Sequence, residues 1–590
     1  MKKMLYVVSV ALFAGLATGV ASAKMTISSL NGAITSTEAS SFKTFMSGES
    51  PPTQNTYDNT CADGTPGMEC EALGLMYEVT NDPALLNQMV QYADAFLWLR
   101  NNTNSGQIMW DGLRDPVWLT KATNTATAGY AGCENNDIVG HIAYCAKLIL
   151  ESPALWNTAV PSGDPYTNGV TYFQRAQTYI TQMDLTQDAY MLKWFISPLT
   201  YQIVAPSESA WTAEEQSVNA WNRQMMFLNG FQRLSECHQL LGDNPARVLK
   251  YNKIVQASVN WFFNASLSGL TTYTSNSVPV YNWDYAPVSG GSEDLSLHSD
   301  YDMWGLNRAY LDGIYTNLTA SMMTPFGNTL QNVIYKSGNT FAGWVSGDVV
   351  DGSRNYIYPA WIMVADLAPT NYFIVANADI AQGSQGSTAI FDAFILWAKN
   401  ARSTGSFPTN YNGPDFTISV PWTCTVSSSS NATCTVTLNP LSGFTNTVTL
   451  STSHLPPGVT ASFSAPAITN GSGTVTLTLS ASNTTPGGIY ALTSGVIITG
   501  ASSLETHTAP LAVVVRPHPA ITRVSLSGGN CIISGTNGFR ANAFYVRGSS
   551  DLSLPKSQWA LLASNTFAAD GSFSVTNSSA SGAGYYCIQY

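Results

Sequence analysis

The sequence has few charged residues and few histidines. Only 11% of its 590 residues are Asp, Glu, Lys or Arg, and only 6 are His, whereas roughly a quarter of the residues of a typical globular domain are charged. Intrinsic disorder is excluded all the same, because 45% of the residues are hydrophobic and such a composition can form a buried core. A polar but weakly charged surface is typical of exported proteins.

Two kinds of cofactor pattern are also missing. The sequence has no Gly-rich phosphate loop and no alternation of strands with helices, which argues against a nucleotide-binding fold. It has no C-x-x-C and no pair of histidines at ligand spacing, which argues against a metal site. We therefore expect no cofactor and no metal. Asp300 and Asp302 are better explained as acidic residues at a helix start than as ligands of a structural cation.

Long apolar runs are confined to the N-terminus. Lys2 and Lys3 precede an apolar stretch over 5–20, and Ala21-Ser22-Ala23 follows it. This order predicts a signal peptide over 1–23 and a secreted protein, located outside the cell, on its surface or in the periplasm. The alternative, an N-terminal membrane anchor, is disfavoured because the stretch is short for a bilayer span. We expect a monomer with no membrane span.

Negative charge is concentrated in the first two thirds of the chain. The net charge is −12 in total. Residues 417–590 contribute five Lys or Arg against three Asp or Glu, and Lys2 and Lys3 are also cationic, so residues 24–416 carry −16. Because nucleic acids are polyanions, we do not expect this region to bind nucleic acid.

The region before residue 410 has the hydrophobic periodicity of helices. Apolar residues recur at three- and four-residue spacing over 85–100, 136–152, 170–183, 215–241, 245–264, 299–314 and 389–401. Paired helices of this length predict an α/α toroid over 24–410, a ring in which inner helices line a cleft and outer helices cover them. The fold class is therefore expected to be mainly α.

Two all-β modules are predicted after the helical region. Alternating Thr, Val and Ser over 473–479 and the turn at 455–459 indicate a sandwich over 415–516. This segment resembles the immunoglobulin-like modules of secreted bacterial enzymes, and the resemblance implies a spacer or adhesion role. A smaller β module is expected over 517–590.

Aromatic residues in these modules offer a second role. Trp422, Trp559 or Tyr585 could stack on sugars, although we favour packing because aromatic side chains in a sandwich usually belong to its core.

Nine cysteines suit an exported protein with disulfides. The expected pairs, each within one predicted domain, are Cys61 with Cys70, Cys424 with Cys434, and Cys531 with Cys587. The pairing of Cys133, Cys145 and Cys237 stays open.

The helical region has three histidines. His298 follows a loop rich in groups that transfer protons, including Tyr285, Glu293 and Asp294, and a functional role is favoured there. His141 follows Asn135-Asn136-Asp137, which is either a helix cap or part of a site. His238 is expected to be structural, because it lies in the last turn of a predicted helix, where the helix dipole favours it.

The order of these elements resembles the α/α-toroid polysaccharide lyases of the alginate and glucuronan lyase kind. The resemblance spans roughly 80–400. The matching pieces are the helix 137–150 with His141, Trp221-Asn222-Arg223-Gln224, the helix 251–263, Trp283-Asp284-Tyr285, and Glu293-Asp294 with His298.

The resemblance implies β-elimination on a polysaccharide that contains uronic acid. Such an enzyme neutralises the uronate carboxylate, removes the C5 proton and protonates the leaving O4. On this reading Asn222 and His141 face the carboxylate, His298 is the base, and Tyr285 is the acid or the combined acid–base. The remaining roles are positive charge from Arg223 or Arg308, orientation of the histidine by Glu293 or Asp294, and substrate contacts by Asn136 and Trp283.

Two other functions remain open. A glycoside hydrolase on the same fold would use two carboxylates, with Glu134 or Asp137 on one side and Glu293, Asp294 or Asp300 on the other. A non-catalytic sugar-binding or adhesion protein ranks third, because a fold alone does not determine a function.

Overall fold

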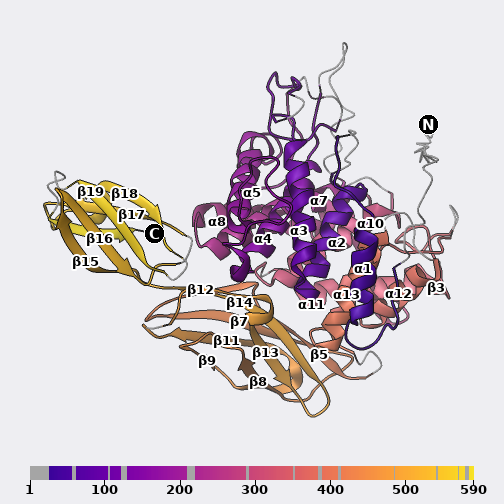
Figure 1. The fold of residues 1–590 in the computed structure, drawn as a ribbon. Coiled ribbons are helices and arrows are strands. Elements are labelled where there is room, and N and C mark those ends of the chain that lie inside the picture. The colour runs from indigo at the N-terminus through magenta and orange to yellow at the C-terminus, as the bar shows by residue number, and fades with distance from the viewer. Residues whose placement is uncertain are drawn as a thin grey trace.

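The computed structural model describes residues 25–589 apart from a few short segments. These are 56–60, 104–105, 121–128, 209–210, 212–219, 288–290, 316, 350–352, 383–387, 410–412, 484, 540–541, 569–570 and 579–583. The predicted signal peptide and its cleavage site lie outside the described residues. A helical N-terminal region is followed by two β modules (Figure 1).

The helical region contains thirteen α-helices in its described part. They are α1 (Ser36–Met46), α2 (Thr65–Thr80), α3 (Pro83–Trp98), α4 (Asn135–Leu150), α5 (Tyr172–Thr186), α6 (Leu192–Trp194), α7 (Trp221–Leu241), α8 (Pro245–Phe262), α9 (Ala265–Ser268), α10 (Leu297–Asp312), α11 (Ala320–Thr329), α12 (Thr370–Gln382) and α13 (Thr388–Ser403). The region also contains the 3-10 helices η1 (Pro153–Leu155) and η5 (Pro359–Asp366), the π-helical turns η2 (Gln187–Met191) and η4 (Leu330–Ile334), and the short strands β1 (Thr271–Ser275), β2 (Val278–Asn282), β3 (Tyr335–Ser337) and β4 (Thr340–Phe341). The seven predicted helical segments are confirmed as helices within the described residues; positions 215–219 of the segment 215–241 lie outside them.

Local sequence signals set the ends of several helices. Thr35 and Thr171 form capping boxes that start α1 and α5, which satisfies backbone N–H groups that have no partner inside the helix. Gly242 and Gly313 end α7 and α10 with φ of 66° and 70°, a left-handed conformation that glycine adopts without steric cost. None of the described helices is long and apolar enough to cross a bilayer.

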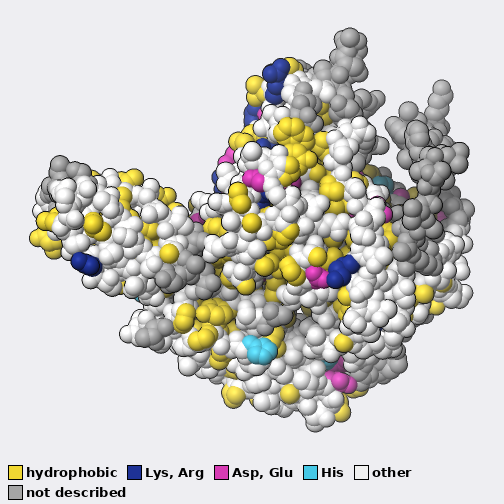
Figure 2. All heavy atoms as spheres, viewed as in Figure 1, with side chains coloured by type: hydrophobic (Ala, Val, Ile, Leu, Met, Phe, Trp, Pro, Cys, Tyr) yellow, Lys and Arg dark blue, Asp and Glu magenta, His cyan; other side chains and the backbone are white. Residues whose placement is uncertain are grey.

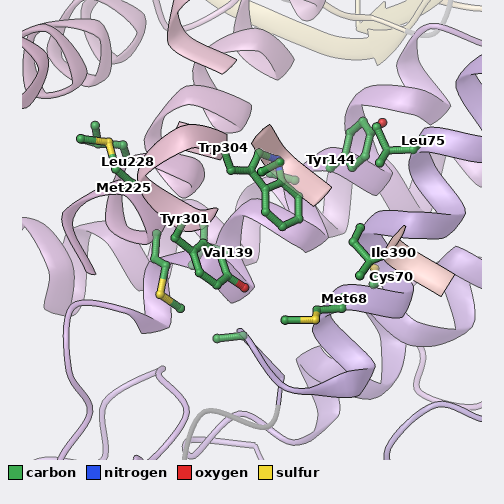
Figure 3. Close-up of a cluster of buried hydrophobic side chains, with 14 of the residues drawn as sticks. Met68, Cys70, Leu75, Val139, Tyr144, Met225, Leu228, Tyr301, Trp304 and Ile390 are labelled. Atoms are coloured by element: carbon green, nitrogen blue, oxygen red, sulfur yellow. The ribbon is translucent and has the colours of Figure 1, made fainter. Parts of the chain in front are cut away.

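Six helices pack in a closed order. α2 packs against α4, α4 against α7, α7 against α10, α10 against η5, η5 against α13, and α13 returns to α2. The helices α3, α5, α8 and α12 pack against members of this series. Side chains from α2, α4, α7, α10 and α13 meet in one apolar cluster (Figure 3). Its labelled members are Met68, Cys70, Leu75, Val139, Tyr144, Met225, Leu228, Tyr301, Trp304 and Ile390.

Four helices of the series run parallel to one another. From α2 to α4, Glu71 contacts His141, and further along both helices Glu78 lies 3.9 Å from Lys147. From α4 to α7, Asn136 donates to the Phe227 carbonyl, and later Cys237 donates to that of Ala143. From α7 to α10, Arg308 reaches the Met225 carbonyl and Gln232 reaches Asp312. The N-termini of α2, α4, α7 and α10 therefore lie at one end of the helical region.

The first β module is a sandwich. One sheet has the order β5-β7-β11-β9, and the other has the order β10-β8-β13-β14-β12 with β6 parallel to β14. The strands are β5 (Asp415–Ser419), β6 (Thr423–Ser427), β7 (Asn431–Leu441), β8 (Val448–Ser453), β9 (Val459–Phe463), β10 (Ala467–Ile468), β11 (Gly473–Ala481), β12 (Gly488–Tyr490), β13 (Val496–Ala501) and β14 (Thr506–Arg516). The predicted alternation is confirmed in β11, where Val475, Leu477 and Leu479 are buried and the residues between them are more exposed.

The C-terminal module consists of two three-stranded sheets. Their orders are β15-β16-β19 and β18-β17-β20. The strands are β15 (Ala520–Ser527), β16 (Asn530–Thr536), β17 (Ala543–Ser549), β18 (Ala560–Thr566), β19 (Phe573–Ser578) and β20 (Tyr585–Gln589). A small core that includes Phe544, Phe567 and Phe573 lies between the sheets.

The sandwich is docked on the helical region (Figure 1). Phe407, Ile489, Ala512 and Val514 belong to the apolar core of the helices and not to that of the sandwich. The indole ring of Trp422 lies 3.6 Å from the Lys147 ammonium of α4, and the Trp422 backbone N–H donates to the Asp312 carbonyl at the end of α10. The sandwich thus closes the end of the helical region opposite to the helix N-termini. The spacer or adhesion role that the resemblance implies stays a prediction.

The nine cysteines are free thiols, and all of them lie in the described residues. Cys531 points into the C-terminal core, whereas Cys587 lies on the outer face of the other sheet, between the inward Tyr586 and Ile588. This geometry contradicts the predicted disulfide between them. Cys61 and Cys70 are also unbonded.

Cys424 and Cys434 are neighbours in the sandwich. Their side chains hydrogen-bond to each other, although no disulfide joins them. Their pairing in an oxidising compartment stays a prediction.

We expect Trp422→Ala to lower the free energy of unfolding by about 2–4 kcal/mol, because it removes packing area and the cation–π contact with Lys147. Denaturant titration followed by circular dichroism measures the loss. Trp98→Ala is the matched control, since Trp98 is 42% exposed and its loss should cost about 1 kcal/mol or less. Equal losses in the two variants would contradict the role of Trp422 in docking.

Candidate functional site

A cavity of about 340 Å³ opens beside the start of α10. It is lined by Tyr285, Gly291, Ser292, Glu293, Asp294, His298 and Trp344. Three extended segments build it. The Glu293 N–H donates to the Trp283 carbonyl at 2.8 Å, the Tyr285 N–H donates to that of Gly291, and the Val345 N–H donates to that of Glu293. These backbone bonds fix the cavity wall to a rigid frame.

His298 lies in the first turn of α10, next to Asp294. Ser296 caps the helix by accepting from the His298 N–H at 3.2 Å, and Asp294 accepts from the Ser296 N–H at 2.7 Å. This turn places Asp294 Oδ2 3.3 Å from His298 Nδ1. The Nδ1 atom is buried while the side chain is 38% exposed, so the edge that carries Nε2 is the accessible one.

Electrostatics stabilises the pair as imidazolium and carboxylate. Burial opposes both charges, but hydrogen bonds from His298 and Ser296 lower the pKa of Asp294 to about 2. Burial likewise disfavours a charged His298, yet the hydrogen bond to Asp294 and the charges of Asp294 and Glu293 raise its pKa above the ordinary value. His298 therefore becomes a neutral base at a higher pH than a free histidine does.

A carboxyl pair lies behind the histidine. Glu293 is fully buried and hydrogen-bonds to Asp302, and Trp283 Nε1 donates to Asp302 Oδ2 at 2.8 Å. Burial and the neighbouring carboxyl groups raise the pKa of Glu293 well above its usual range. Burial raises the pKa of Asp302 well above its usual range as well, and two carboxyl groups in contact share a proton. Trp283 is fully buried and supports Asp302, which rules it out as a sugar-stacking platform.

Tyr285 and Arg223 form the other side of the site. The rings of Tyr285 and His298 are 5.0 Å apart at 47°. The Trp221 N–H at the start of α7 donates to the Tyr285 carbonyl, which brings the first turn of α7, with Asn222 and Arg223, close to the cavity. Burial raises the pKa of the Tyr285 hydroxyl, although the Arg223 charge lowers it in part. The phenol is therefore protonated at neutral pH.

The structure separates the predicted site into two groups. Tyr285, Glu293, Asp294 and His298 meet at the cavity, with Asn222 and Arg223 close by. His141, Asn136 and Arg308 do not line it. Asn136 bonds to Phe227 and Gln187, and Arg308 bonds to Gln232 and Met225, all in the interior. These positions correct the expectation that the three residues face substrate.

His141 belongs to a buried charge network. It is 1% exposed, its Nδ1 lies 3.2 Å from Glu71 and its Nε2 lies 3.3 Å from Asp137. Although burial opposes the charge, these carboxylates raise the pKa of His141 to about 10. Arg233 continues the network, since it contacts Glu71 and Glu236. His141 is a structural cation.

Other sequence candidates are also accounted for. The structural role expected for His238 is confirmed, because its ring lies between Asp184 and Asp243. Asp300 accepts from the Ala360 N–H at 2.7 Å, and burial raises its pKa to about 8. Asp137 accepts a hydrogen bond from the Asn229 amide and pairs with His141. Burial opposes the charge of Arg223, but the nearby Glu134 carboxylate raises the pKa of Arg223.

Sequence reasoning missed Trp344 and the role of Asp302. Trp344 is partly exposed and lines the cavity, where its segment pairs with Asp294. It comes from a loop about 50 residues further along the chain, so no local pattern links it to His298. Asp302 lies four residues after His298 in the same predicted helix, and this spacing indicates that the two side chains share one helix face.

Three side chains could hold a divalent cation. One ligand atom each of Glu293, Asp294 and His298 lies within 4.8 Å of the others. Binding there would have to displace the proton that Glu293 holds.

Comparisons with known proteins leave the family open. The sequence matches no family model and no curated protein. One solved structure that matches in part is a crystal structure of domains 4 and 5 of the S-layer protein SbsC, with 25% identity over 17% of this chain and a TM-score of 0.13. The chain spans about half of that structure, 54% of its length. Overlap this small carries no conclusion about fold or function.

We expect Asp294→Asn to lower the pKa of His298, because the variant removes the anion that stabilises the imidazolium. Imidazole carbon shifts followed by NMR across pH measure the midpoint, and His298→Ala assigns the signal. The titration should move to lower pH than in the natural protein. An unchanged midpoint would show that Asp294 does not control His298.

We expect His141→Gln to lower the free energy of unfolding by about 3–5 kcal/mol, because it leaves Glu71 and Asp137 buried without their cation. The folded-state pKa of His141 is raised to about 10, so its contribution is complete below about pH 6.5 and is lost as the pH rises through about 10. Denaturant titrations at several pH values test both points. The exposed His518 gives the control variant His518→Gln, with a change within about 0.5 kcal/mol.

Proposed function

We propose that the helical region is the catalytic domain of a secreted, monomeric polysaccharide lyase of the α/α-toroid kind. The closed packing order from α2 through α13 and the parallel course of α2, α4, α7 and α10 support a toroid. The observation that carries the proposal is the cavity that joins Tyr285, His298 and Asp294 at the end where those helices start.

The site suits a substrate that carries a carboxylate. Arg223 lies near Tyr285 and His298, and Asn222 precedes it in the first turn of α7. Each helix N-terminus adds a partial positive charge of roughly half a unit. A uronate whose carboxylate faces the start of α7 would be neutralised there, which acidifies its C5 proton.

His298 acts as the base in this proposal. Its accessible Nε2 removes the C5 proton, and the electron pair of that C–H bond forms the C4–C5 double bond. Asp294 holds the imidazole by Nδ1 and stabilises the imidazolium that results, as a carboxylate does beside other histidine bases. The raised pKa of His298 predicts that the rate climbs with pH above the range of an ordinary histidine.

Tyr285 acts as the acid. As the C4–O4 bond breaks, the phenol donates its proton to the leaving oxygen, so one product has an unsaturated uronate end and the other a new hydroxyl group. The raised pKa of Tyr285 keeps the proton available. The imidazolium can return its proton to the phenolate across the short distance between the rings.

One observation favours a glycoside hydrolase as second candidate. Glu293 is held protonated and Asp294 ionised, and two carboxyl groups with opposite pKa shifts are typical of glycosidases. Their nearest ligand atoms, however, lie within 4.8 Å of each other, closer than the carboxyl pairs of glycosidases, and the predicted partners Glu134 and Asp137 do not line the cavity. The lyase is therefore preferred.

We expect His298→Ala and Tyr285→Phe each to lower the rate of ultraviolet absorbance increase on uronate polymers by about 10²–10⁴-fold, because each removes a proton-transfer group. Alginate, glucuronan, pectate and a neutral glycan form the panel, and reducing ends are measured in parallel.

His518→Ala and Tyr273→Phe are matched controls outside the site and should leave the rate unchanged. New reducing ends without an ultraviolet rise would overturn the lyase and favour the hydrolase. Near-full activity in both site variants would show that this cavity is not the active site.

A further inference from the structure

The outer face of the sheet β18-β17-β20 is a candidate binding surface. Side chains alternate along each strand, and Phe544 and Val546 point into the core. Tyr545 and Arg547 therefore point outward, and their partners in the register, Gln589 and Cys587 of β20, lie on the same face. Figure 2 shows that hydrophobic side chains are exposed on this module.

Two tyrosines are exposed on this face. Tyr545 is 41% exposed and Tyr585 is 44% exposed, and Leu561, opposite Arg547, is 55% exposed. Tyr545 pairs with Gln589, four residues along β20 from Tyr585, so at roughly 3.3 Å per residue the rings are about 13 Å apart along the strands. One sugar ring can stack on only one of them, and a chain is needed to reach both.

The charge between the tyrosines is positive and held in place. Arg547 Nε donates to Gln589 Oε1 at 2.5 Å, and its Nη1 donates to the Trp559 carbonyl at 3.0 Å. No Asp or Glu occurs in β17, β18 or β20. Residues 517–590 carry a net charge of +2, with Arg523, Arg540, Arg547 and Lys556 against Asp551 and Asp570.

We propose that this face binds an anionic polysaccharide chain, with sugar rings stacked on Tyr545 and Tyr585 and a carboxylate bound by Arg547. Tyrosine presents an amphipathic face to sugars, and a guanidinium oriented by two hydrogen bonds suits a carboxylate. The choice of a uronate polymer rests on the proposed function. Of the aromatic residues considered from the sequence, Tyr585 fits this role, whereas Trp559 is 4% exposed and Trp422 contacts Lys147.

Binding and catalysis are separable in this chain. Affinity electrophoresis of the full chain uses gels that contain alginate or polygalacturonate, with dextran as the neutral polymer. The background is His298→Ala, so that cleavage cannot remove the polymer. We expect the polyanions to retard the chain and dextran not to, and Tyr545→Ala, Tyr585→Ala or Arg547→Gln to weaken retardation roughly tenfold.

Matched controls come from the same chain. Tyr273→Ala removes a tyrosine that is 40% exposed on β1, and Arg523→Gln removes an exposed arginine from β15 on the other sheet. Both should leave retardation unchanged. Cys587 provides a local probe, since it is the one cysteine that is not buried. Alginate should slow its alkylation severalfold, and Tyr585→Ala should abolish this protection.

The outcomes separate the two proposals. No retardation by polyanions, equal retardation by dextran, or equal effects of site and control variants would overturn the binding face. Retardation that depends on Tyr545 and Tyr585 in a chain that cleaves no uronate polymer would support the face and overturn the lyase. Cleavage of a uronate polymer by a chain that shows no such retardation would support the lyase and overturn the binding face.

Discussion

Pairing of buried charges between parallel helices is the constraint on which the helical region depends. Glu71, His141, Arg233 and Glu236 are all less than 10% exposed and come from three different helices. A buried ion without a partner costs several kcal/mol, so only one relative shift of α2, α4 and α7 satisfies all four. The same register places the N-termini of these helices at one end. The candidate site lies at that end because α10 and α7 are held in this alignment.

The two ends of the helical region have different chemistry. At the N-terminal end, the first turns of α7 and α10 lie beside the cavity that Tyr285 and His298 line, and the positive end of a helix dipole favours anions. At the other end, the ring of Trp422 in the sandwich lies over the Lys147 ammonium, which pairs with the buried Glu236. The sandwich therefore contributes to the environment of the buried charges as well as to the shape of the protein.

Much of the fold could be predicted from the sequence, because helix periodicity and strand alternation are local. α2 was missed because its acidic residues Glu69 and Glu71 interrupt the apolar pattern, although both are buried. The loop before His298 was found because proton-transfer groups are dense there. His141 was placed wrongly because its partner Glu71 is 70 residues away. Trp344 and the orientation of Cys587 likewise depend on contacts and strand pairing that spacing alone does not show.

The net charge of −16 on residues 24–416 opposes an anionic substrate, but this sum counts every carboxyl group as ionised. Burial raises the pKa of Glu69, Asp115 and Asp366 to about 7 and that of Glu151 and Asp300 to about 8. The pKa values of Glu293, Asp302 and Asp312 rise well above the usual range. Several of these groups are therefore neutral or partly neutral at pH 7, and the negative charges of Glu71 and Asp137 are offset locally by His141 and Arg233. The field that an approaching polyanion meets is weaker than the formal charge suggests. Local cations such as Arg223 can then decide which ligand enters the cavity.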